Sequence, residues 1–185
     1  MNKPLLLFVG KSSSGKTTIA NFLEQKYGYH QVQSYTTRPP RYKGEVGHTF
    51  VSDEEFDGLG ELAAYTFYNG HKYGTTYNQI DECDMYVIDP DGVKTLLKNY
   101  ETSRDIIIIY FDASVYTRIN RMIERGDSDT KVLSRLLEDE KDDWLKILRQ
   151  IEDKFGDEMG VSLYSVDANQ SVSSVINQIL FFINF

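Results

Sequence analysis

Eight residues near the start of the chain, 10–17, are of the types and in the order that bind phosphate groups. They read Gly-Lys-Ser-Ser-Ser-Gly-Lys-Thr and match the pattern G-x-x-x-x-G-K-[ST] in full. The two glycines let the backbone turn tightly enough for its N–H groups to surround phosphate oxygens. We expect Lys16 to reach the β- and γ-phosphates of a nucleoside triphosphate and the Thr17 hydroxyl to bind Mg²⁺. The candidates for nucleotide binding in and beside this phosphate loop are Gly10, Ser12, Ser13, Ser14, Gly15, Lys16, Thr17 and Thr18.

An acidic residue follows a second apolar run. Asp89 closes the segment Met85–Ile88, which has the length and composition of a buried strand. Because ligands bind at the carboxyl ends of parallel strands, we expect Asp89 to hold Mg²⁺ directly or through water. Asp91 either faces the same crevice or caps the helix expected to begin there.

Two arginines lie three residues apart around a Pro-Pro pair. Arg38 and Arg41 belong to the segment 34–41, Ser-Tyr-Thr-Thr-Arg-Pro-Pro-Arg. Since proline fixes φ, the two guanidinium groups are held without a helix or strand and can clamp one phosphate bidentately. Tyr73, followed by Gly74 and a threonine, offers a phenol at a tight turn, and its alternative role is that of a core aromatic.

Three further arginines share one helical face. Arg118, Arg121 and Arg125 are spaced i, i+3 and i+7. Gly126 and the polar run Asp127–Thr130 follow and predict a mobile loop. Arginines beside a mobile loop are typical of a lid over a phosphoryl-transfer site, although a salt-bridged surface helix has the same pattern.

The elements that would position these residues alternate between strand and helix. Strands are expected at Pro4–Val9, His30–Tyr35, Met85–Ile88, Ile106–Phe111 and Val161–Val166, and helices at Ile19–Tyr27, Gly92–Lys98, Ser114–Glu124, Lys131–Lys154 and Val172–Phe182. This alternation predicts an α/β fold in which helices cover both faces of a parallel sheet. Residues 36–80 are rich in Thr, Pro, Gly and Tyr and predict a small subdomain with some β structure.

Composition excludes several classes of protein. The 185 residues carry a formal net charge of −8, which argues against a nucleic-acid partner. No apolar run approaches the roughly 18 residues needed to cross a bilayer, so we expect no membrane partner. Cys83 is the single cysteine and indicates an intracellular thiol. We expect a cytoplasmic location.

The motifs together resemble the guanylate kinase family, over nearly the whole chain. Besides the phosphate loop, the matching segments are 34–41, Gly44-Glu45-Val46, Phe50-Val51-Ser52 with Glu54-Glu55-Phe56, Tyr73-Gly74-Thr75, Asp89-x-Asp91-Gly92-Val93 and Arg121-x-x-x-Arg125-Gly126. The resemblance implies ATP-dependent phosphorylation of GMP or dGMP with Mg²⁺. The expected partners are these small molecules alone, with the chain a monomer or a homodimer.

The resemblance also implies an architecture and a set of site residues. The architecture is a single three-layer P-loop kinase domain over 1–185, with a core (1–35, 81–124 and 136–185), a small mixed-β acceptor-binding subdomain (36–80) and a mobile lid (125–135). The implied catalytic residues are Lys16, Arg38, Arg121, Arg125 and Arg135. The implied acceptor-binding residues are Ser34, Arg38, Arg41, Glu45, His48, Tyr73, Thr75 and Asp91, of which Ser34, Thr75 and Asp91 would lie near the guanine.

Two departures from the family pattern concern the acceptor. Ala64 stands where the family has a glutamate that reads the guanine edge, and Glu61 is the nearest carboxylate along the chain. His48 falls nearest the place of a family tyrosine that contacts the acceptor phosphate. In these departures and in Asn69-Gly70, the chain resembles a relative of the family, the kinase that phosphorylates ribose 1,5-bisphosphate. There are three alternatives: a kinase of this fold with another acceptor, a non-catalytic binding module of the same family, and an unrelated P-loop NTPase. Non-catalytic modules of this family lose the phosphate loop, whereas this chain keeps it.

Overall fold

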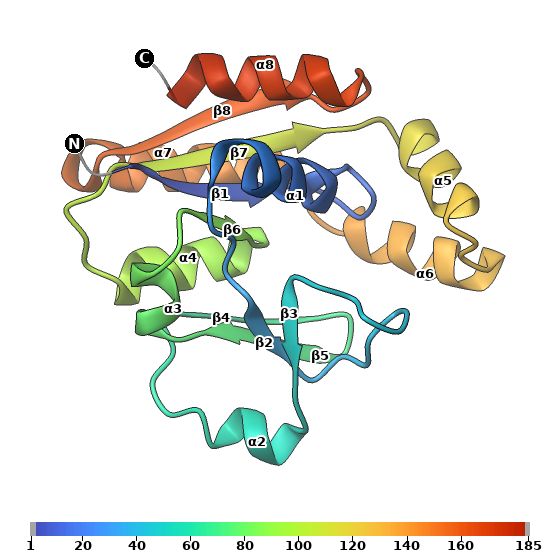
Figure 1. The fold of residues 1–185 in the computed structure, drawn as a ribbon, viewed down its shortest axis with the longest axis horizontal. Coiled ribbons are helices and arrows are strands. Elements are labelled where there is room, and N and C mark those ends of the chain that lie inside the picture. The colour runs from blue at the N-terminus through green and yellow to red at the C-terminus, as the bar shows by residue number, and fades with distance from the viewer. Residues whose placement is uncertain (1–2, 184–185) are drawn as a thin grey trace.

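Four parallel strands form the main sheet of the structure, a computed structural model that describes residues 3–183 (Figure 1). Their order across the sheet is β6, β1, β7, β8. Their bounds are Leu5–Val9 for β1, Met85–Val87 for β6, Ile106–Asp112 for β7 and Val161–Asp167 for β8. Because β1 pairs with β6 on one side and β7 on the other, the strand that precedes the phosphate loop is fixed along both edges.

Helices cover both faces of the main sheet. They are α1 (Lys16–Tyr27), α4 (Pro90–Asn99), α7 (Trp144–Met159) and α8 (Val172–Ile183). On β1, Leu6 and Phe8 share an apolar cluster with α1 and α8. Leu5, Leu7 and Val9 share another with α4 and α7. Alternate side chains of a strand point to opposite faces, so this uninterrupted apolar run requires both helical layers. The expected α/β fold with a parallel core sheet is confirmed.

A second, mixed sheet lies beside the main one. Its order is β3, β2, β5, β4, with β2 parallel to β3 and the other pairs antiparallel. The bounds are Ser34–Thr36 for β2, His48–Phe50 for β3, Ala64–Tyr68 for β4 and His71–Thr75 for β5. Asn69 and Gly70 join β4 to β5 with φ of 48° and 79°, as a two-residue hairpin with a primed turn requires. The sheet begins at Ser34, two residues before the boundary expected from composition.

Four further helices complete the fold. They are α2 (Asp53–Asp57), α3 (Tyr77–Asp81), α5 (Val115–Glu124) and α6 (Asp129–Asp139). Figure 1 shows α5 and α6 side by side at the end of the main sheet toward which β7 points. Both helices are therefore within reach of the edge where the phosphate loop lies.

Two sequence expectations about elements are wrong. The strand expected at His30–Tyr35 is reduced to an isolated bridge between Gln31 and Met85, and β2 starts only at Ser34. The single helix expected at Lys131–Lys154 is two helices, α6 and α7. Asp143 accepts a hydrogen bond from the Lys146 N–H at 3.1 Å and starts α7 as its N-cap, which interrupts the helical backbone.

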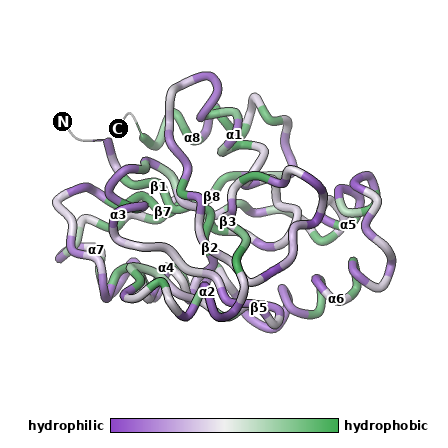
Figure 2. Tube along the Cα trace, turned by 60° about the horizontal axis from the view of Figure 1, so that its bottom comes forward, coloured by the Kyte–Doolittle hydropathy of each residue, from purple (hydrophilic) through white to green (hydrophobic). Residues whose placement is uncertain are grey.

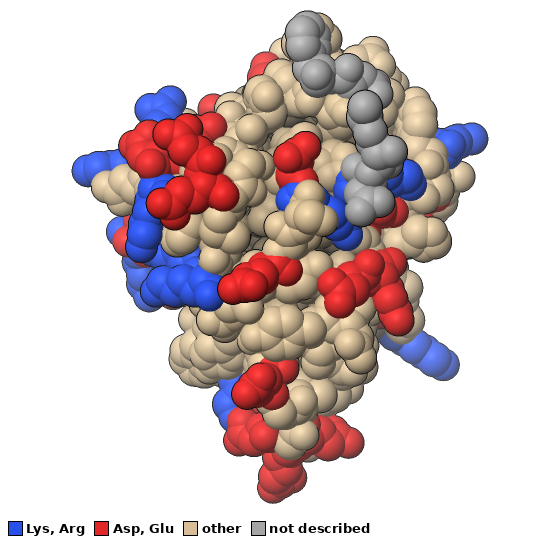
Figure 3. Space-filling model, turned by 90° about the vertical axis from the view of Figure 1, so that its left-hand side faces the viewer, with Lys and Arg blue, Asp and Glu red and all other residues tan. Residues whose placement is uncertain are grey.

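The surface and the interior separate clearly. Figure 2 shows hydrophobic residues along β1 and β7 in the interior, with mostly hydrophilic residues in the connecting loops. Acidic side chains gather over α2, whose first turn contains Asp53, Glu54 and Glu55 (Figure 3). Across residues 3–183, no helix is long and apolar enough to span a bilayer.

Candidate active site

A cavity of about 610 Å³ opens at the carboxyl edge of the main sheet. Each core strand contributes to its wall near its carboxyl end, through Gly10, Asp89, Phe111 and Ala168. The mixed sheet, α5 and α6 supply much of the remaining wall, with smaller parts from α1, α7 and α8. This is the position at which open α/β sheets bind ligands.

The phosphate loop has a backbone that only some residues can adopt. Ser13 and Gly15 have φ of 60° and 102°. A Cβ atom at Gly10 would lie 2.9 Å from the Phe111 carbonyl oxygen and 2.8 Å from Ser14 Oγ, so the strand end has room for glycine alone. The Ser13 hydroxyl is buried and has no hydrogen-bond partner within the described residues. The loop thus presents buried polar groups toward a space that an anion can fill.

Lys16 lies inside this loop. Its Nζ donates to the Gly10 and Lys11 carbonyl oxygens at 2.5 and 3.0 Å and to Ser14 Oγ at 3.2 Å. Burial lowers the pKa of Lys16 to about 8, and the carboxylate of Asp139 opposes this shift. The ammonium is thus poorly hydrated, which favours its interaction with an anion in the cavity.

Two further features make the loop electropositive. Helix α1 begins at Lys16 with no side-chain cap and no acidic residue in its first turn, so its N-terminal N–H groups face the cavity edge uncompensated. Arg121 of α5 lies against the loop. Its Nη1 donates to the Ser14 carbonyl oxygen at 3.1 Å, and its Nη2 donates to the Ala168 carbonyl oxygen at 2.8 Å.

Asp89 and Thr17 both line the cavity. One oxygen of Asp89 accepts the Gly92 N–H at 2.8 Å and caps α4. Burial raises the pKa of Asp89. A hydroxyl and a carboxylate are hard oxygen ligands, and Mg²⁺ takes only one or two such groups from a protein when substrate phosphates supply others. The pair therefore fits Mg²⁺.

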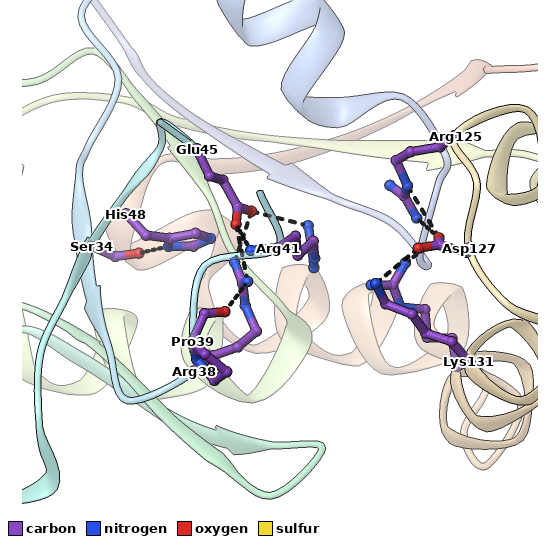
Figure 4. A network of polar contacts seen from close by, with 10 residues as sticks. Ser34, Arg38, Pro39, Arg41, Glu45, His48, Arg125, Asp127 and Lys131 are labelled. Atoms are coloured by element: carbon purple, nitrogen blue, oxygen red, sulfur yellow. Dashed lines mark hydrogen bonds and ion pairs between the residues drawn. The ribbon is translucent and has the colours of Figure 1, made fainter. Parts of the chain in front are cut away.

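Arg38 and Arg41 are held together by one carboxylate. Both Nη atoms of Arg38 donate to Glu45, at 3.1 and 2.9 Å, and the Arg41 N–H donates to it at 2.6 Å (Figure 4). Burial would raise the pKa of Glu45, but the hydrogen bonds from the two arginines lower it. The Nε of Arg38 is buried and has no partner among the described residues.

A second carboxylate organises the basic residues near α6. Asp127 accepts from Arg125, from Arg135 at 2.9 Å and from Lys131 at 3.0 Å (Figure 4). Burial would raise the pKa of Asp127, but the bonds from Arg125 and Lys131 lower it. Three cations share one carboxylate, so this group keeps a net positive charge beside the cavity.

The two arginine groups converge on the same space. Burial lowers the pKa of Arg41 to about 10, and the charges of Arg38, Arg135 and Arg125 act in the same direction. Arg41, Arg125 and Arg135 all line the cavity. Four guanidinium groups from distant parts of the sequence are therefore close enough to repel one another, which favours binding of a polyanion between them.

His48 is a neutral member of the site. Its Nδ1 is 2.9 Å from Ser34 Oγ, and its ring packs edge-on against Tyr73 with centroids 5.8 Å apart. Burial lowers the pKa of His48 to about 4, and the charges of Arg38 and Arg41 add to this. The imidazole can therefore hydrogen-bond a ligand at neutral pH without adding charge.

The structure does not gather every expected residue in the cavity wall. Thr75 is buried and donates to Gln79 at 2.9 Å. The Asp91 side chain is 74% exposed and forms an ion pair with Lys94, in a smaller hollow beside the cavity. Ala64 is 1% exposed and belongs to the apolar cluster below the main sheet, while Glu61 is exposed and lies outside the cavity wall.

Several wall residues carry no sequence motif. They are Thr66, Tyr68, Tyr86, Asp139 and Trp144. Alternation along β4 places Thr66 and Tyr68 on one face, which gives a weak signal once the strand is known. Asp139 follows Arg135 by one helical turn. Arg118, whose alternative was a surface ion pair, is 1% exposed and bonds to Asp139 at 2.8 Å.

Comparisons with known proteins agree with this description. Over 147 residues the chain is 31% identical to the guanylate kinase of Helicobacter pylori, covering 72% of this chain and 70% of that protein. It is also 31% identical over 149 residues to the guanylate kinase of Geobacter metallireducens, covering 72% and 71%. The crystal structure of guanylate kinase from Anaplasma phagocytophilum superposes with a TM-score of 0.57 at 18% identity, covering 100% of this chain and 86% of that one, and supports the fold alone. No family model matches the chain.

A parallel sheet with a phosphate loop at its carboxyl edge, facing convergent arginines, defines the class of the protein as a nucleotide kinase. The identity to curated relatives over more than two thirds of both chains then settles the family. The chain belongs to the guanylate kinase family.

Proposed function

We propose that this protein transfers the γ-phosphoryl group of ATP to GMP or dGMP in the presence of Mg²⁺. The observation that carries the proposal is one cavity lined by both a phosphate loop and arginines from three other parts of the chain. One part suits the phosphates of a donor, and the other suits the phosphate of an acceptor. The names of the curated relatives support the same reaction.

The donor phosphates would lie in the phosphate loop. The backbone N–H groups of the loop and the N-terminus of α1 would surround them, and Lys16 would turn from its carbonyl partners toward the transferring phosphate. Because Lys16 is partly buried, less water has to reorganise when charge develops on the transferring oxygens.

Thr17 and Asp89 are the residues that would hold Mg²⁺. When bound, the ion neutralises charge on the donor phosphates. Asp89 is braced by the Gly92 N–H, which fixes one of its oxygens.

The acceptor phosphate would replace Glu45 as a partner of Arg38 and Arg41. The unpartnered Nε of Arg38 supports this exchange, since a bidentate phosphate contact can use it. Arg125 and Arg135 would in turn stabilise charge on the group in transit, and both lie close enough to lower the pKa of Arg41. In-line transfer between two such clamps requires positioning and charge compensation rather than covalent catalysis.

A second acceptor is supported by one specific observation. The position of the base-reading glutamate is Ala64, which is buried in an apolar cluster, and Glu61 lies outside the cavity wall. Ribose 1,5-bisphosphate needs no base-reading carboxylate and would use the same arginines. A binding module without catalysis has less support, because the phosphate loop keeps its lysine and threonine.

A coupled assay with MgATP over a panel of acceptors tests the proposal. GMP and dGMP are expected to give the highest turnover. AMP and IMP are expected to be excluded less strictly than by a site that reads the base with a paired carboxylate. Phosphorylation of ribose 1,5-bisphosphate but of no nucleoside monophosphate would replace the proposed function by its alternative. ATP binding without any phosphoryl transfer would support a binding module.

A further inference from the structure

Asp139 has a set of contacts that the proposed reaction does not use. It is the last residue of α6, it lines the cavity, and it has no exposed surface. Its carboxylate accepts the Ser12 N–H at 2.8 Å, the Ser12 hydroxyl at 3.2 Å, the Tyr68 hydroxyl at 2.6 Å and Arg118 Nη1 at 2.8 Å. Burying a carboxylate costs desolvation free energy, and the four donors that compensate for it hold the Asp139 side chain in one position.

The donors come from three separate parts of the molecule. Ser12 belongs to the phosphate loop, Tyr68 ends strand β4 of the mixed sheet, and Arg118 lies on α5. In Figure 1, the mixed sheet and the loop that follows β1 lie in different layers. Asp139 therefore joins the sheet that carries the acceptor-side residues to the loop that carries the donor-side residues.

In the contact between Tyr68 and Asp139, the tyrosine is the hydrogen-bond donor and the carboxylate is the acceptor. Burial raises the pKa of Tyr68, and the charge of Asp139 raises it further, so the phenol keeps its proton and donates to the carboxylate. The same carboxylate fixes both the backbone and the side chain of Ser12, and it is the strongest charge that opposes the lowering of the Lys16 pKa. A displacement of the Asp139 carboxylate would therefore change the position of the loop backbone and the electrostatic environment of Lys16.

Helices α5 and α6 are attached to the phosphate loop by a second set of contacts that does not involve Tyr68. The Tyr68 contact is the one that connects the mixed sheet to Asp139. Glu140 pairs with Lys11 at 2.8 Å and with Arg118 at 2.5 Å, which fastens the helices to the loop beside Asp139. Removal of the Tyr68 hydroxyl would leave these contacts in place. It would release only the connection between the mixed sheet and the carboxylate.

We propose that Asp139 is a positioning residue that couples the mixed sheet to the phosphate loop, so that the Tyr68 hydroxyl sets how tightly the loop binds donor phosphates. The inference deepens the proposed function and rests on its assignment of the donor to the phosphate loop. It does not depend on which acceptor is used.

The deciding experiment compares two variants of one strand. Tyr68→Phe removes the hydroxyl and keeps the ring beside Trp144, whose centroid is 6.3 Å away. Tyr65→Phe makes the same chemical change at an exposed position on the other face of β4. Binding of the magnesium complex of a non-hydrolysable ATP analogue is measured by calorimetry. We expect Tyr68→Phe to weaken it about threefold to tenfold and Tyr65→Phe to leave it unchanged.

A packing role for Tyr68 predicts equal donor affinity in the two variants, and that result overturns the proposal. A wild type that does not bind the analogue overturns both the proposal and the donor assignment. A wild type that binds the analogue but not GMP overturns the acceptor of the proposed function, while the donor titrations of the two variants still decide the coupling.

A double-mutant cycle gives an independent readout. Asp139→Asn removes the charge that pairs with buried Arg118, so its circular dichroism is recorded first to confirm the fold. If Tyr68 acts through Asp139, adding Tyr68→Phe to Asp139→Asn weakens donor binding by less than it does in the wild type. Equal, additive losses would show that Tyr68 reaches the loop by another route and would overturn the proposal.

Discussion

The donor and acceptor halves of the cavity are held by different kinds of interaction. The phosphate loop is fixed by backbone geometry, with a glycine packed against β7 and a lysine bonded to loop carbonyls. The arginines are fixed by carboxylates, Arg38 by Glu45 on the acceptor side and Arg135 by Asp127 on the other side of the cavity. Under the proposed function, the backbone of the donor half is formed in advance, while Arg38 and Arg41 would stay paired with Glu45 until the acceptor phosphate takes its place.

Lys16→Ala tests the donor half most severely. Loss of the ammonium removes charge stabilisation that only the transition state needs in full, so turnover should fall by at least about a hundredfold. The measurement is kcat in the coupled assay, with circular dichroism to show that the fold survives. A folded variant with near-normal turnover would mean that this loop is not the catalytic one.

Ala64→Glu tests whether the acceptor half could take the family's carboxylate. Ala64 lies in an apolar cluster outside the cavity wall, so the new charge would be buried without a partner. We expect the free energy of unfolding to fall by about 3 kcal/mol. Urea denaturation measures this, with Ala64→Val as the uncharged control. A stable variant that selects GMP more strictly would show that the side chain reaches the base after all.

Arg41→Met separates the two halves kinetically. Arg41 lines the cavity on the acceptor side, so its loss should raise the KM for the acceptor about tenfold and leave the KM for ATP nearly unchanged. Lys43→Met, an exposed change in the same loop, is the matched control. Equal increases in both constants would mean that Arg41 serves donor and acceptor alike.

The pH dependence of donor binding follows from Lys16. Its pKa is lowered to about 8, so the free protein loses the ammonium as pH rises through 8 and donor affinity should fall, approaching tenfold per pH unit. A lysine in the unfolded chain titrates near 10.4, so between about pH 8 and 10 the unfolded state binds more protons and this group makes folding more favourable as pH rises. Calorimetry with the ATP analogue and urea denaturation at pH 7.5 and 9.5 should therefore show opposite trends.

Asp91→Asn should have the smallest effect. The side chain is mostly exposed and paired with Lys94, and such pairs contribute little. We expect the acceptor KM to stay within about twofold of the wild type in the coupled assay. A tenfold increase would place Asp91 at the acceptor and restore the role that the family resemblance implies.

Local patterns explain what the sequence predicted well. The phosphate loop, the strand that precedes it and the position of Asp89 depend on contiguous residues, so the parallel sheet and its ligand edge could be inferred. The break between α6 and α7 was missed, although the Asp143 N-cap that starts α7 is a local signal. The contacts of Asp139 join residues up to 127 positions apart, and no spacing along the chain encodes them.

The position of Trp144 has a practical consequence. It is the single tryptophan of the chain, it is 8% exposed, and it lines the cavity beside Tyr68. Its indole is therefore the sole source of tryptophan emission and lies where a bound nucleotide would change the local polarity. The native protein carries its own optical reporter, so stopped-flow fluorescence can follow the arrival and departure of each substrate without a label.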